Sequence, residues 1–369
     1  MDNYLKKQII TYMGNKRKLL TNISNIIDKV KEELNQDTLI TADAFSGSGI
    51  VSRLLKTKSN VLYTNDIAGY SKTLNSCFLF TPTKKEEQII KHYIKKANIF
   101  AYNNDNNVNI PKWIRKHWAP EGKISKSHRV YFTEKNALLI DKYMYFINTI
   151  PEKYKCFLLA QVLVQASMHN NTNGQFSAYY KDDNGIGKYG GKKEIDIKRI
   201  TKDILLEYPI FNNNICEIHI SQMDANNWIK TIPKVDIIYL DPPYNKHPYS
   251  IYYFMLDIIN NWDMSLEIPS TYRGQPKNWI KSKYNSFSKA EETFKDLIKS
   301  INSKFIILSY NNKGIIPIKK IEKILSQKGK LYKIPVNHKT YNKLKGIASY
   351  KREKKWEEVK EYFWLIDTR

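Results

Sequence analysis

The chain has 369 residues, of which 42% are hydrophobic and 26% are charged, as is ordinary for a globular protein with a packed core. Its 60 Lys and Arg residues exceed its 36 Asp and Glu residues and give a formal net charge of +24, which indicates attraction to a polyanion, usually nucleic acid. A lysine-rich proteome with A/T-rich codon usage would give a similar composition, and charge does not separate DNA from RNA.

The cysteine pattern argues against both a disulfide-stabilised fold and a zinc site. Cys77, Cys156 and Cys216 are odd in number and widely spaced, unlike the cysteines of a disulfide framework or a zinc site. The N-terminus lacks the apolar core of a signal peptide, and no stretch approaches the length of a membrane span. We therefore expect a soluble cytoplasmic protein with no metal and no membrane partner.

Short apolar runs alternate with longer helical patterns over much of the chain. This alternation predicts an α/β fold with a mostly parallel sheet and helices on both faces. The predicted strands are residues 39–45, 61–65, 235–240, 305–310 and 362–366. The predicted helices around them are residues 16–33, 49–56, 71–80, 252–262, 290–301 and 317–327.

The middle of the chain has a different pattern. Helical periodicity at 88–100, 136–150 and 153–167 is followed by a polar stretch with several glycines, and no strand is predicted there. We expect an inserted, mainly helical domain at 82–220 between the two parts of a core domain, 1–81 and 221–369. The alternative is that these helices simply pack on the sheet.

A glycine-rich turn connects the first predicted strand to the next helix. Glycine lets the backbone turn sharply and approach a ligand, and the helix N-terminus presents free N–H groups. The following strand ends in Asn65 and Asp66, where a carboxylate can accept hydrogen bonds from ribose hydroxyls. The turn lacks the dinucleotide and phosphate-loop patterns, so we expect a nucleoside-bearing cofactor without a pyrophosphate. The turn consists of Asp43, Ala44, Phe45, Ser46, Gly47, Ser48 and Gly49.

The most informative tetrapeptide follows the apolar run 235–240 directly: Asp241, Pro242, Pro243 and Tyr244. In open α/β sheets, ligands bind at the carboxyl ends of the strands. An acid, a backbone carbonyl of fixed direction and a flat ring at this place suit an amino group on a flat heterocycle. The alternative is a turn that merely ends a strand.

These segments together resemble the amino-directed DNA methyltransferases, and most closely the Dam-type N6-adenine family. The segment 12–16 is similar to that family's N-terminal Tyr-x-Gly-x-Lys motif, 308–312 to another strand-end motif and 359–366 to its closing strand. The order also matches the alpha arrangement of the family, with the cofactor motifs first, a long insert, and the catalytic tetrapeptide last. In that arrangement the insert recognises the DNA target sequence.

The resemblance implies S-adenosylmethionine as the cofactor and a Rossmann-like methyltransferase sheet. For Lys16 the residues leave open a pairing with the cofactor carboxylate or the start of a basic helix. Asp224 either contacts the cofactor's adenine or caps the helix that begins near Asn226. The expected cofactor-binding residues are Tyr12, Gly14, Lys16, Asp43, Phe45, Ser46, Gly47, Ser48, Gly49, Asp66, Ile67, Asp224 and Asp241.

The catalytic roles follow from the chemistry of the adenine amine, which is a poor nucleophile because its lone pair is delocalised. Hydrogen bonds from the amine to the Asp241 carboxylate and the Pro242 carbonyl would direct that lone pair at the methyl group. Pro243 restricts the residue before it, and Tyr244 would stack on a base flipped out of double-stranded DNA. Positioning and electrostatics then supply most of the acceleration.

Contacts to DNA are expected near the tetrapeptide and in the insert. Amide side chains can read adenine edges, aromatic rings can support displaced bases and lysines can hold phosphates. The alternative for this part of the insert is a solvated surface loop, and further basic residues at 343–355 are either phosphate contacts or a solvated face. The expected substrate-binding residues are Tyr244, Asn245, Tyr249, Asn173, Gln175, Tyr179, Lys181 and Lys193.

Rival functions share parts of this pattern. Cytosine-N4 methylation uses the same geometry, but Ser is commoner there at the position of Asp241, and a protein glutamine methyltransferase would carry Asn. RNA adenine is opposed by the long insert, and a nucleic-acid-binding protein with an inactive fold by the intact motifs. We expect a monomer and a possible cognate restriction endonuclease, while the DNA recognition sequence is not readable.

Overall fold

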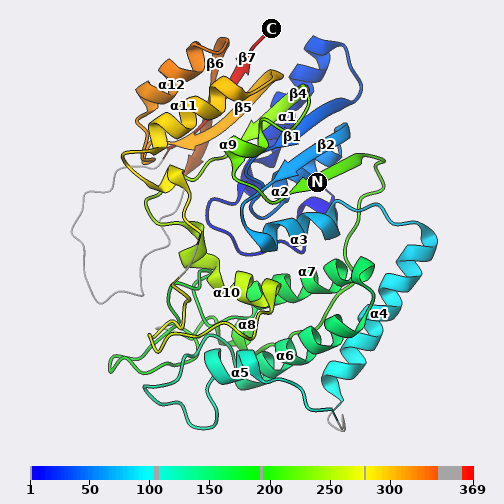
Figure 1. Cartoon of the computed structure of the whole chain (residues 1–369), viewed down its shortest axis with the longest axis vertical. Coiled ribbons are helices and arrows are strands. Elements are labelled where there is room, and N and C mark those ends of the chain that lie inside the picture. Colours follow the sequence, from blue (N-terminus) through cyan, green and yellow to red (C-terminus); the bar gives the residue numbers. More distant parts are fainter. Residues whose placement is uncertain (1, 104–107, 192–193, 278–279, 340–359) are drawn as a thin grey trace.

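The computed structural model describes residues 2–103, 108–191, 194–277, 280–339 and 360–369. The chain forms a sheet lobe and a helical lobe, one above the other in Figure 1. The described strands form a seven-stranded sheet in the order β3-β2-β1-β4-β5-β7-β6, in which β7 runs antiparallel to the other six strands. The strands are β1 (Leu39–Asp43), β2 (Ser59–Asn65), β3 (Glu217–Ser221), β4 (Val235–Leu240), β5 (Ser303–Asn311), β6 (Lys330–Lys339) and β7 (Lys360–Asp367).

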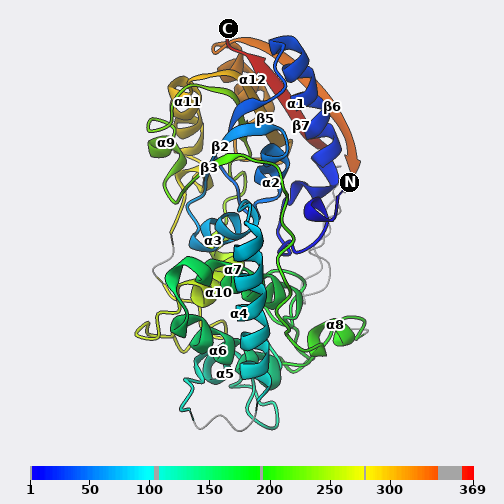
Figure 2. The ribbon, with the colours of Figure 1, turned by 90° about the vertical axis from the view of Figure 1, so that its right-hand side faces the viewer.

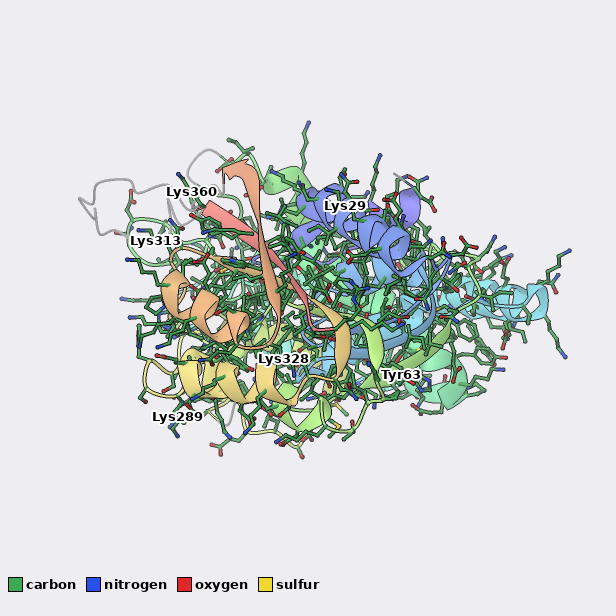
Figure 3. The ribbon with its side chains drawn as sticks, turned by 90° about the horizontal axis from the view of Figure 1, so that it is seen from above. Lys29, Tyr63, Lys289, Lys313, Lys328 and Lys360 are labelled. Atoms are coloured by element: carbon green, nitrogen blue, oxygen red, sulfur yellow. The ribbon has the colours of Figure 1, made fainter. Side chains whose placement is uncertain are left out.

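Helices cover both faces of this sheet, which confirms the predicted layering. On one face pack α1 (Leu20–Leu34) and α2 (Ile50–Lys56), whose apolar residues share a core with β1, β2 and β5. On the other pack α9 (Ala225–Trp228), α11 (Ala290–Ser300) and α12 (Ile318–Ser326). Seen from above, the blue helices lie on one side of the strands and the yellow and orange helices on the other (Figure 3).

The five predicted strands are confirmed to within two residues at each end. The sequence pattern missed β3 and β6, the two edge strands, because neither carries the apolar run of a buried strand. In β3, exposed positions alternate with half-buried ones. In β6, the exposed positions include Lys330 and Lys333. One helix also needs correction, because its first residues, Lys16–Leu19, form a 3-10 turn before α1 begins.

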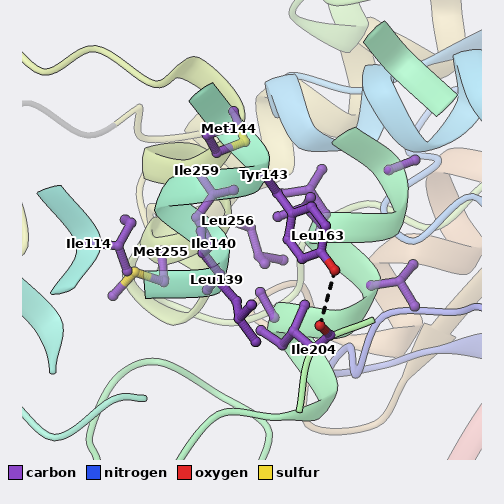
Figure 4. Packing of buried hydrophobic residues seen from close by; sticks show 14 of the residues in the cluster. Ile114, Leu139, Ile140, Tyr143, Met144, Leu163, Ile204, Met255, Leu256 and Ile259 are labelled. Atoms are coloured by element: carbon purple, nitrogen blue, oxygen red, sulfur yellow. Dashed lines mark hydrogen bonds between the residues drawn. The ribbon is translucent and has the colours of Figure 1, made fainter. Parts of the chain in front are cut away.

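The helical lobe is built from the middle of the chain and from α10. Apolar side chains of α6, α7 and α10 interdigitate in one cluster, which includes Ile140, Leu163 and Leu256 (Figure 4). The cluster extends to α3 (Gly69–Phe78), so the two lobes share a continuous core at their junction. The elements of this lobe are α4 (Lys84–Tyr102), α5 (Trp113–Trp118), α6 (Glu134–Thr149), α7 (Glu152–Met168), α8 (Ile197–Thr201) and α10 (Tyr249–Asn261).

A buried arginine fastens the N-terminal segment to the sheet lobe. The Arg53 guanidinium on α2 donates hydrogen bonds to the carbonyls of Tyr4 (3.1 Å), Lys7 (3.1 Å) and Gln8 (2.7 Å). It also lies 3.7 Å from the ring centroid of Phe78. Burial lowers the pKa of Arg53 to about 10, so the group stays charged at neutral pH. The contacts fix the chain immediately before the segment that enters the candidate site.

Replacing this arginine is therefore expected to destabilise the protein. Arg53→Met leaves two buried carbonyls and one partly buried carbonyl without this donor and should cost about 3–5 kcal/mol of unfolding free energy, measured by urea denaturation. The control is Lys58→Met, since the pair of Lys58 with Asp28 is partly exposed and should contribute at most about 1 kcal/mol. Equal losses in the two variants would contradict a fastening role for Arg53.

Candidate active site

The carboxyl ends of β1, β2 and β4 meet at a cavity of about 390 Å³ on the side of the sheet that faces the helical lobe. Its wall includes Gly47 after β1, Asp66 after β2 and Asp241 after β4. The position agrees with the general rule that ligands bind at the carboxyl ends of parallel strands. Among the described residues, no group of three or more His, Cys, Asp or Glu side chains could hold a metal ion.

The glycine-rich turn closes one end of the cavity. Gly47 and Gly49 have φ values of +50° and +76°, a region that favours glycine. The Gly47 N–H donates to Asp66 Oδ2 at 2.7 Å, and a Cβ on Gly47 would lie 2.9 Å from the Tyr12 ring. The turn thus brings backbone, carboxylate and ring into close contact, with no room for a side chain.

Two carboxylates behind the turn are held by fixed donors. Asp66 Oδ1 accepts from the Ala68 N–H at 2.9 Å, and burial raises the pKa of Asp66. Asp43 Oδ2 accepts from Ser52 Oγ at 2.6 Å, while its Oδ1 is buried and has no hydrogen-bond partner among the described residues. Burial raises the pKa of Asp43 to about 7. Asp43 is fully buried and does not line the cavity, so it supports the turn from behind the cavity wall.

The other residues of the predicted cofactor set also gather here. Ile67 lines the cavity, and the buried Ser46 hydroxyl accepts from Asn75 Nδ2 at 2.8 Å. Ser48 is buried in the same turn. For Asp224 the capping alternative is confirmed, because its carboxylate accepts from the first N–H groups of α9, yet the residue also lines the cavity.

Lys16 lies between two carboxylates. Its Nζ is 2.9 Å from Asp241 Oδ2 and 3.1 Å from Glu361 Oε1, and it donates to the Gly14 carbonyl at 3.1 Å. Glu361 comes from β7 and also accepts from Ser309 Oγ on β5 at 2.9 Å. The Lys16 side chain is only 4% exposed, so these contacts are screened little by water. The N-terminal motif is thereby joined to the strand end of β4.

The second carboxylate oxygen of Asp241 is not bound by any residue that the structure describes. Oδ1 is buried and has no hydrogen-bond partner in the described part of the chain, although Asp241 lines the cavity. Burial raises the pKa of Asp241 to about 6, with Lys16 lowering it and Glu361 raising it. The carboxylate is thus ionised at neutral pH, and one of its oxygens lacks a donor that a ligand could provide.

Aromatic rings surround this carboxylate. The Tyr244 ring is buried edge-to-face against Tyr310, and its hydroxyl would lie 2.8 Å from a Cβ on Gly14. The Tyr12 ring stacks on Tyr253 and Tyr249, with centroids 4.6 and 5.2 Å apart. Tyr12 and Tyr249 line the cavity, and the Tyr244 hydroxyl lies beside Gly14 of the N-terminal motif.

The predicted DNA-contacting residues of the insert lie at different depths. Asn173 and Gln175 are half-buried, and Gln175 Nε2 lies 3.5 Å from Met13 Sδ at the edge of the site. The Tyr179 ring is buried against Tyr131, and its hydroxyl donates to a backbone carbonyl. Lys181 is exposed. Lys193 and the lysines at 343–355 lie outside the described residues.

Three site residues were missed by sequence reasoning. Glu361 pairs with Lys16, Tyr284 lines the cavity edge-to-face with Phe45, and Asp257 of α10 lines the cavity within reach of the Asp66 charge. Burial raises the pKa of Asp257 to about 7. A signal existed for Asp257, because it is an acid within the apolar helical run 253–259. Asn245, which was predicted, lies beside the cavity, and its carbonyl accepts from Asn285 Nδ2.

The chain is similar in sequence to several known methyltransferases. The chain is 28% identical to Type II methyltransferase M.NlaIII of Neisseria lactamica over 97% of this chain and 99% of that protein. It is 28% identical to Modification methylase LlaI of Lactococcus lactis subsp. lactis over 83% of this chain. It is also 28% identical to Type II methyltransferase M.FokI of Planomicrobium okeanokoites over 96% of this chain.

The relatives differ in length. The match covers 47% of LlaI and 52% of M.FokI, so the chain spans about half the length of these two. No helix among the described residues has the length and apolar character needed to cross a membrane. The sequence model described as D12 class N6 adenine-specific DNA methyltransferase matches residues 12–324, which include the turn, Lys16 and the tetrapeptide. The chain belongs to the D12 class N6 adenine-specific DNA methyltransferase family.

Proposed function

We propose that this chain transfers a methyl group from S-adenosylmethionine to N6 of an adenine flipped out of double-stranded DNA. The observation that carries the proposal is Asp241, whose Oδ2 is held by Lys16 while its buried Oδ1 has no partner among the described residues. An exocyclic amine supplies the missing donor. Family membership and the three methylase relatives support the same reaction.

The cavity fits the proposed cofactor. Its volume of about 390 Å³ is in the usual range for ligand sites of roughly 300–1,000 Å³. Asp66 lines the cavity and is placed to accept from ribose hydroxyls. Phe45, Tyr284 and Asp224 line the wall where an adenine ring would pack. Bound S-adenosylmethionine would supply an electrophilic methyl group on a positively charged sulfur.

The residues of the chain then prepare the amine. Asp241 Oδ1 accepts one N6 hydrogen and the Pro242 carbonyl the other, which favours a pyramidal nitrogen with its lone pair directed at the methyl group. Lys16 keeps Oδ2 occupied, so that the carboxylate cannot rotate away. Tyr244 would stack on the flipped base. As the N–C bond forms and the S–C bond breaks, N6 loses one proton, for which the ionised Asp241 is the adjacent acceptor.

The helical lobe would bind the duplex next to this cavity. The net charge of +24 favours a polyanion, and the lobe shares its core with α10, which follows the tetrapeptide. We therefore keep 82–220 as the proposed target-recognition region. The names of the relatives M.NlaIII and M.FokI class them as type II methyltransferases, so a cognate endonuclease is a proposed partner.

Product analysis tests the reaction. Duplex DNA incubated with the protein and methyl-labelled S-adenosylmethionine should yield N6-methyladenine after digestion to nucleosides. Labelled N4-methylcytosine instead would favour the rival base. Label in RNA alone would exclude DNA as the substrate, and binding to DNA without any transfer would leave only a binding protein with an inactive fold.

Removing the proposed acceptor should stop the transfer but not DNA binding. Asp241→Ala should lower kcat by about 10²- to 10³-fold or more, since the amine loses its fixed acceptor. Lys16 keeps its pairing with Glu361, and affinity for duplex DNA, which depends mainly on phosphate contacts, should be unchanged. The matched control is Asp37→Ala, an exposed acid just before β1, at the end of that strand opposite the cavity. Turnover by Asp241→Ala at the control rate would overturn the assignment.

The acid limb of the pH profile should move in opposite directions in two variants. Only ionised Asp241 accepts hydrogen bonds at both oxygens and can take up the N6 proton, so kcat/KM should fall as the pH drops through about 6. Lys16→Met removes the charge that lowers the pKa of Asp241, which shifts the limb to higher pH. Glu361→Gln removes a charge that raises this pKa, which shifts the limb to lower pH.

The other groups that face Asp241 are the same in the unmodified protein and in both variants. They are Asp43, whose pKa is about 7, and Tyr239, Tyr244 and Tyr249, which burial keeps neutral by raising their pKa values. Their contribution to the profile is therefore constant. Shifts of the same sign in Lys16→Met and Glu361→Gln would contradict the assignment of the limb to Asp241.

A further inference from the structure

The segment that follows α10 carries a concentrated positive charge. Residues 268–290 include five Lys or Arg residues and no acid. Its described residues 268–277 and 280–289, which we call the basic strap, run from α10 along the helical lobe and back to α11 (Figures 1 and 2). The strap lies outside the insert at 82–220, to which sequence reasoning assigned DNA recognition.

The first half of the strap is fixed to the helical lobe. Arg129 donates to the carbonyls of Thr271 (2.9 Å) and Pro269 (2.6 Å), and Trp118 Nε1 donates to the Arg273 carbonyl at 3.1 Å. A Cβ on Gly274 would lie 2.9 Å from the Arg129 guanidinium, so the backbone packs directly on it. This half of the strap is therefore a built part of the lobe.

The second half forms the rim of the cavity. Ile280, Ser282 and Tyr284 line it together with Gln275 from the first half. Hydrogen bonds join the strap to the chain just after the tetrapeptide: Gln275 Nε2 donates to the Ser250 carbonyl at 3.2 Å, and Ser250 Oγ donates to the Ile280 carbonyl at 3.0 Å. A flipped base that enters the cavity must pass beside the strap.

The exposed side chains of the strap fit a nucleic-acid strand. The Tyr272 side chain is 51% exposed and lies between two cations, with Lys181 Nζ 4.7 Å and the Arg273 guanidinium 5.1 Å from its ring centroid. Lys277 and Lys283 are also exposed. Within the described residues, no carboxylate lies at ion-pair distance from any of these four cations. Their charges are therefore available for an external anion, and an exposed ring beside phosphate-binding cations suits base stacking.

We propose that the basic strap binds the DNA strand that carries the target adenine, with Arg273, Lys277 and Lys283 on its phosphates and Tyr272 against a base beside the flipped one. The proposal rests on the proposed function, since DNA is the ligand, and it adds a contact surface outside the insert. Phosphate contacts hold any sequence equally, so the strap would position the strand while other residues read it.

The test compares two triple variants with the same loss of charge. Arg273→Gln/Lys277→Gln/Lys283→Gln alters the strap. Lys29→Gln/Lys319→Gln/Lys323→Gln removes three exposed lysines from α1 and α12 of the sheet lobe, away from the cavity; Lys29 is labelled in Figure 3. Affinity for duplex DNA is measured at several salt concentrations, together with binding of S-adenosylmethionine and methyl transfer.

The strap variant should bind DNA at least about tenfold more weakly at low salt. The negative slope of log affinity against log salt should become shallower by about 2–3, which is about one for each lost phosphate contact. The sheet-lobe variant should keep the slope of the unmodified protein. Both should bind S-adenosylmethionine normally. Equal affinity and slope in the two variants, with methyl transfer to DNA intact in the unmodified protein, would overturn the strap alone.

The stacking role has its own control. Tyr272→Leu should weaken DNA binding and lower methyl transfer by about tenfold, because stacking of one base on a ring is lost. Tyr332→Leu alters a tyrosine on β6 that is 42% exposed and also lies beside a lysine, and it should have no effect. Equal rates in both variants would exclude Tyr272 from the contact. Failure of the unmodified protein to bind DNA would overturn both the strap and the proposed function.

Discussion

The ion pair of Lys16 with Asp241 is the contact on which the site depends, because it joins three distant parts of the chain. Lys16 comes from the N-terminal segment, Asp241 from the end of β4 and Glu361 from β7. Removing one partner of a buried pair leaves an uncompensated charge. The pairing therefore fixes the N-terminal segment against the sheet and, with it, the aromatic wall that Tyr12 forms with Tyr249 and Tyr253.

The wall of the cavity is acidic. Among the described residues that line it are five aspartates and no Lys or Arg, which favours a positively charged ligand: Asp66, Asp224, Asp241, Asp257 and Asp263. Burial opposes ionisation of Asp241 and Lys16 supports it, so that the pKa of Asp241 stays near 6 and the carboxylate is ionised at neutral pH. A chain with a formal net charge of +24 and an acidic cavity suits a polyanionic substrate and a cationic cofactor.

The sequence alone predicts those parts of the fold and the site that depend on a local pattern. An apolar run that stops at Asp241 predicts a strand end, and a glycine turn before a helix predicts a ligand edge, so the centre of the sheet and the tetrapeptide were both predicted. Glu361 could not be predicted, because its place depends on the antiparallel pairing of β7 with β5, where it lies opposite Asn311. Periodicity contains no information on such long-range pairing.

The loop at 170–181 shows the opposite limit. Its composition suits either DNA contacts or a solvated surface loop, yet Asn171 is fully buried and its side chain donates to the carbonyls of Val130 and Lys188. Composition alone does not distinguish an amide that binds a base from one that satisfies the backbone. The basic strap was likewise assigned to the catalytic part by chain order, although its first half packs on the helical lobe.

The central claim is that Lys16 holds one oxygen of Asp241 and leaves the other for the adenine amine. A crystal structure of the protein with duplex DNA and an unreactive analogue of S-adenosylmethionine tests it most directly. The account predicts adenine N6 within about 2.7–3.2 Å of Asp241 Oδ1, with Lys16 Nζ still on Oδ2. A flipped base whose amine is bound elsewhere, or Lys16 moved from Asp241 to the cofactor carboxylate, would contradict it.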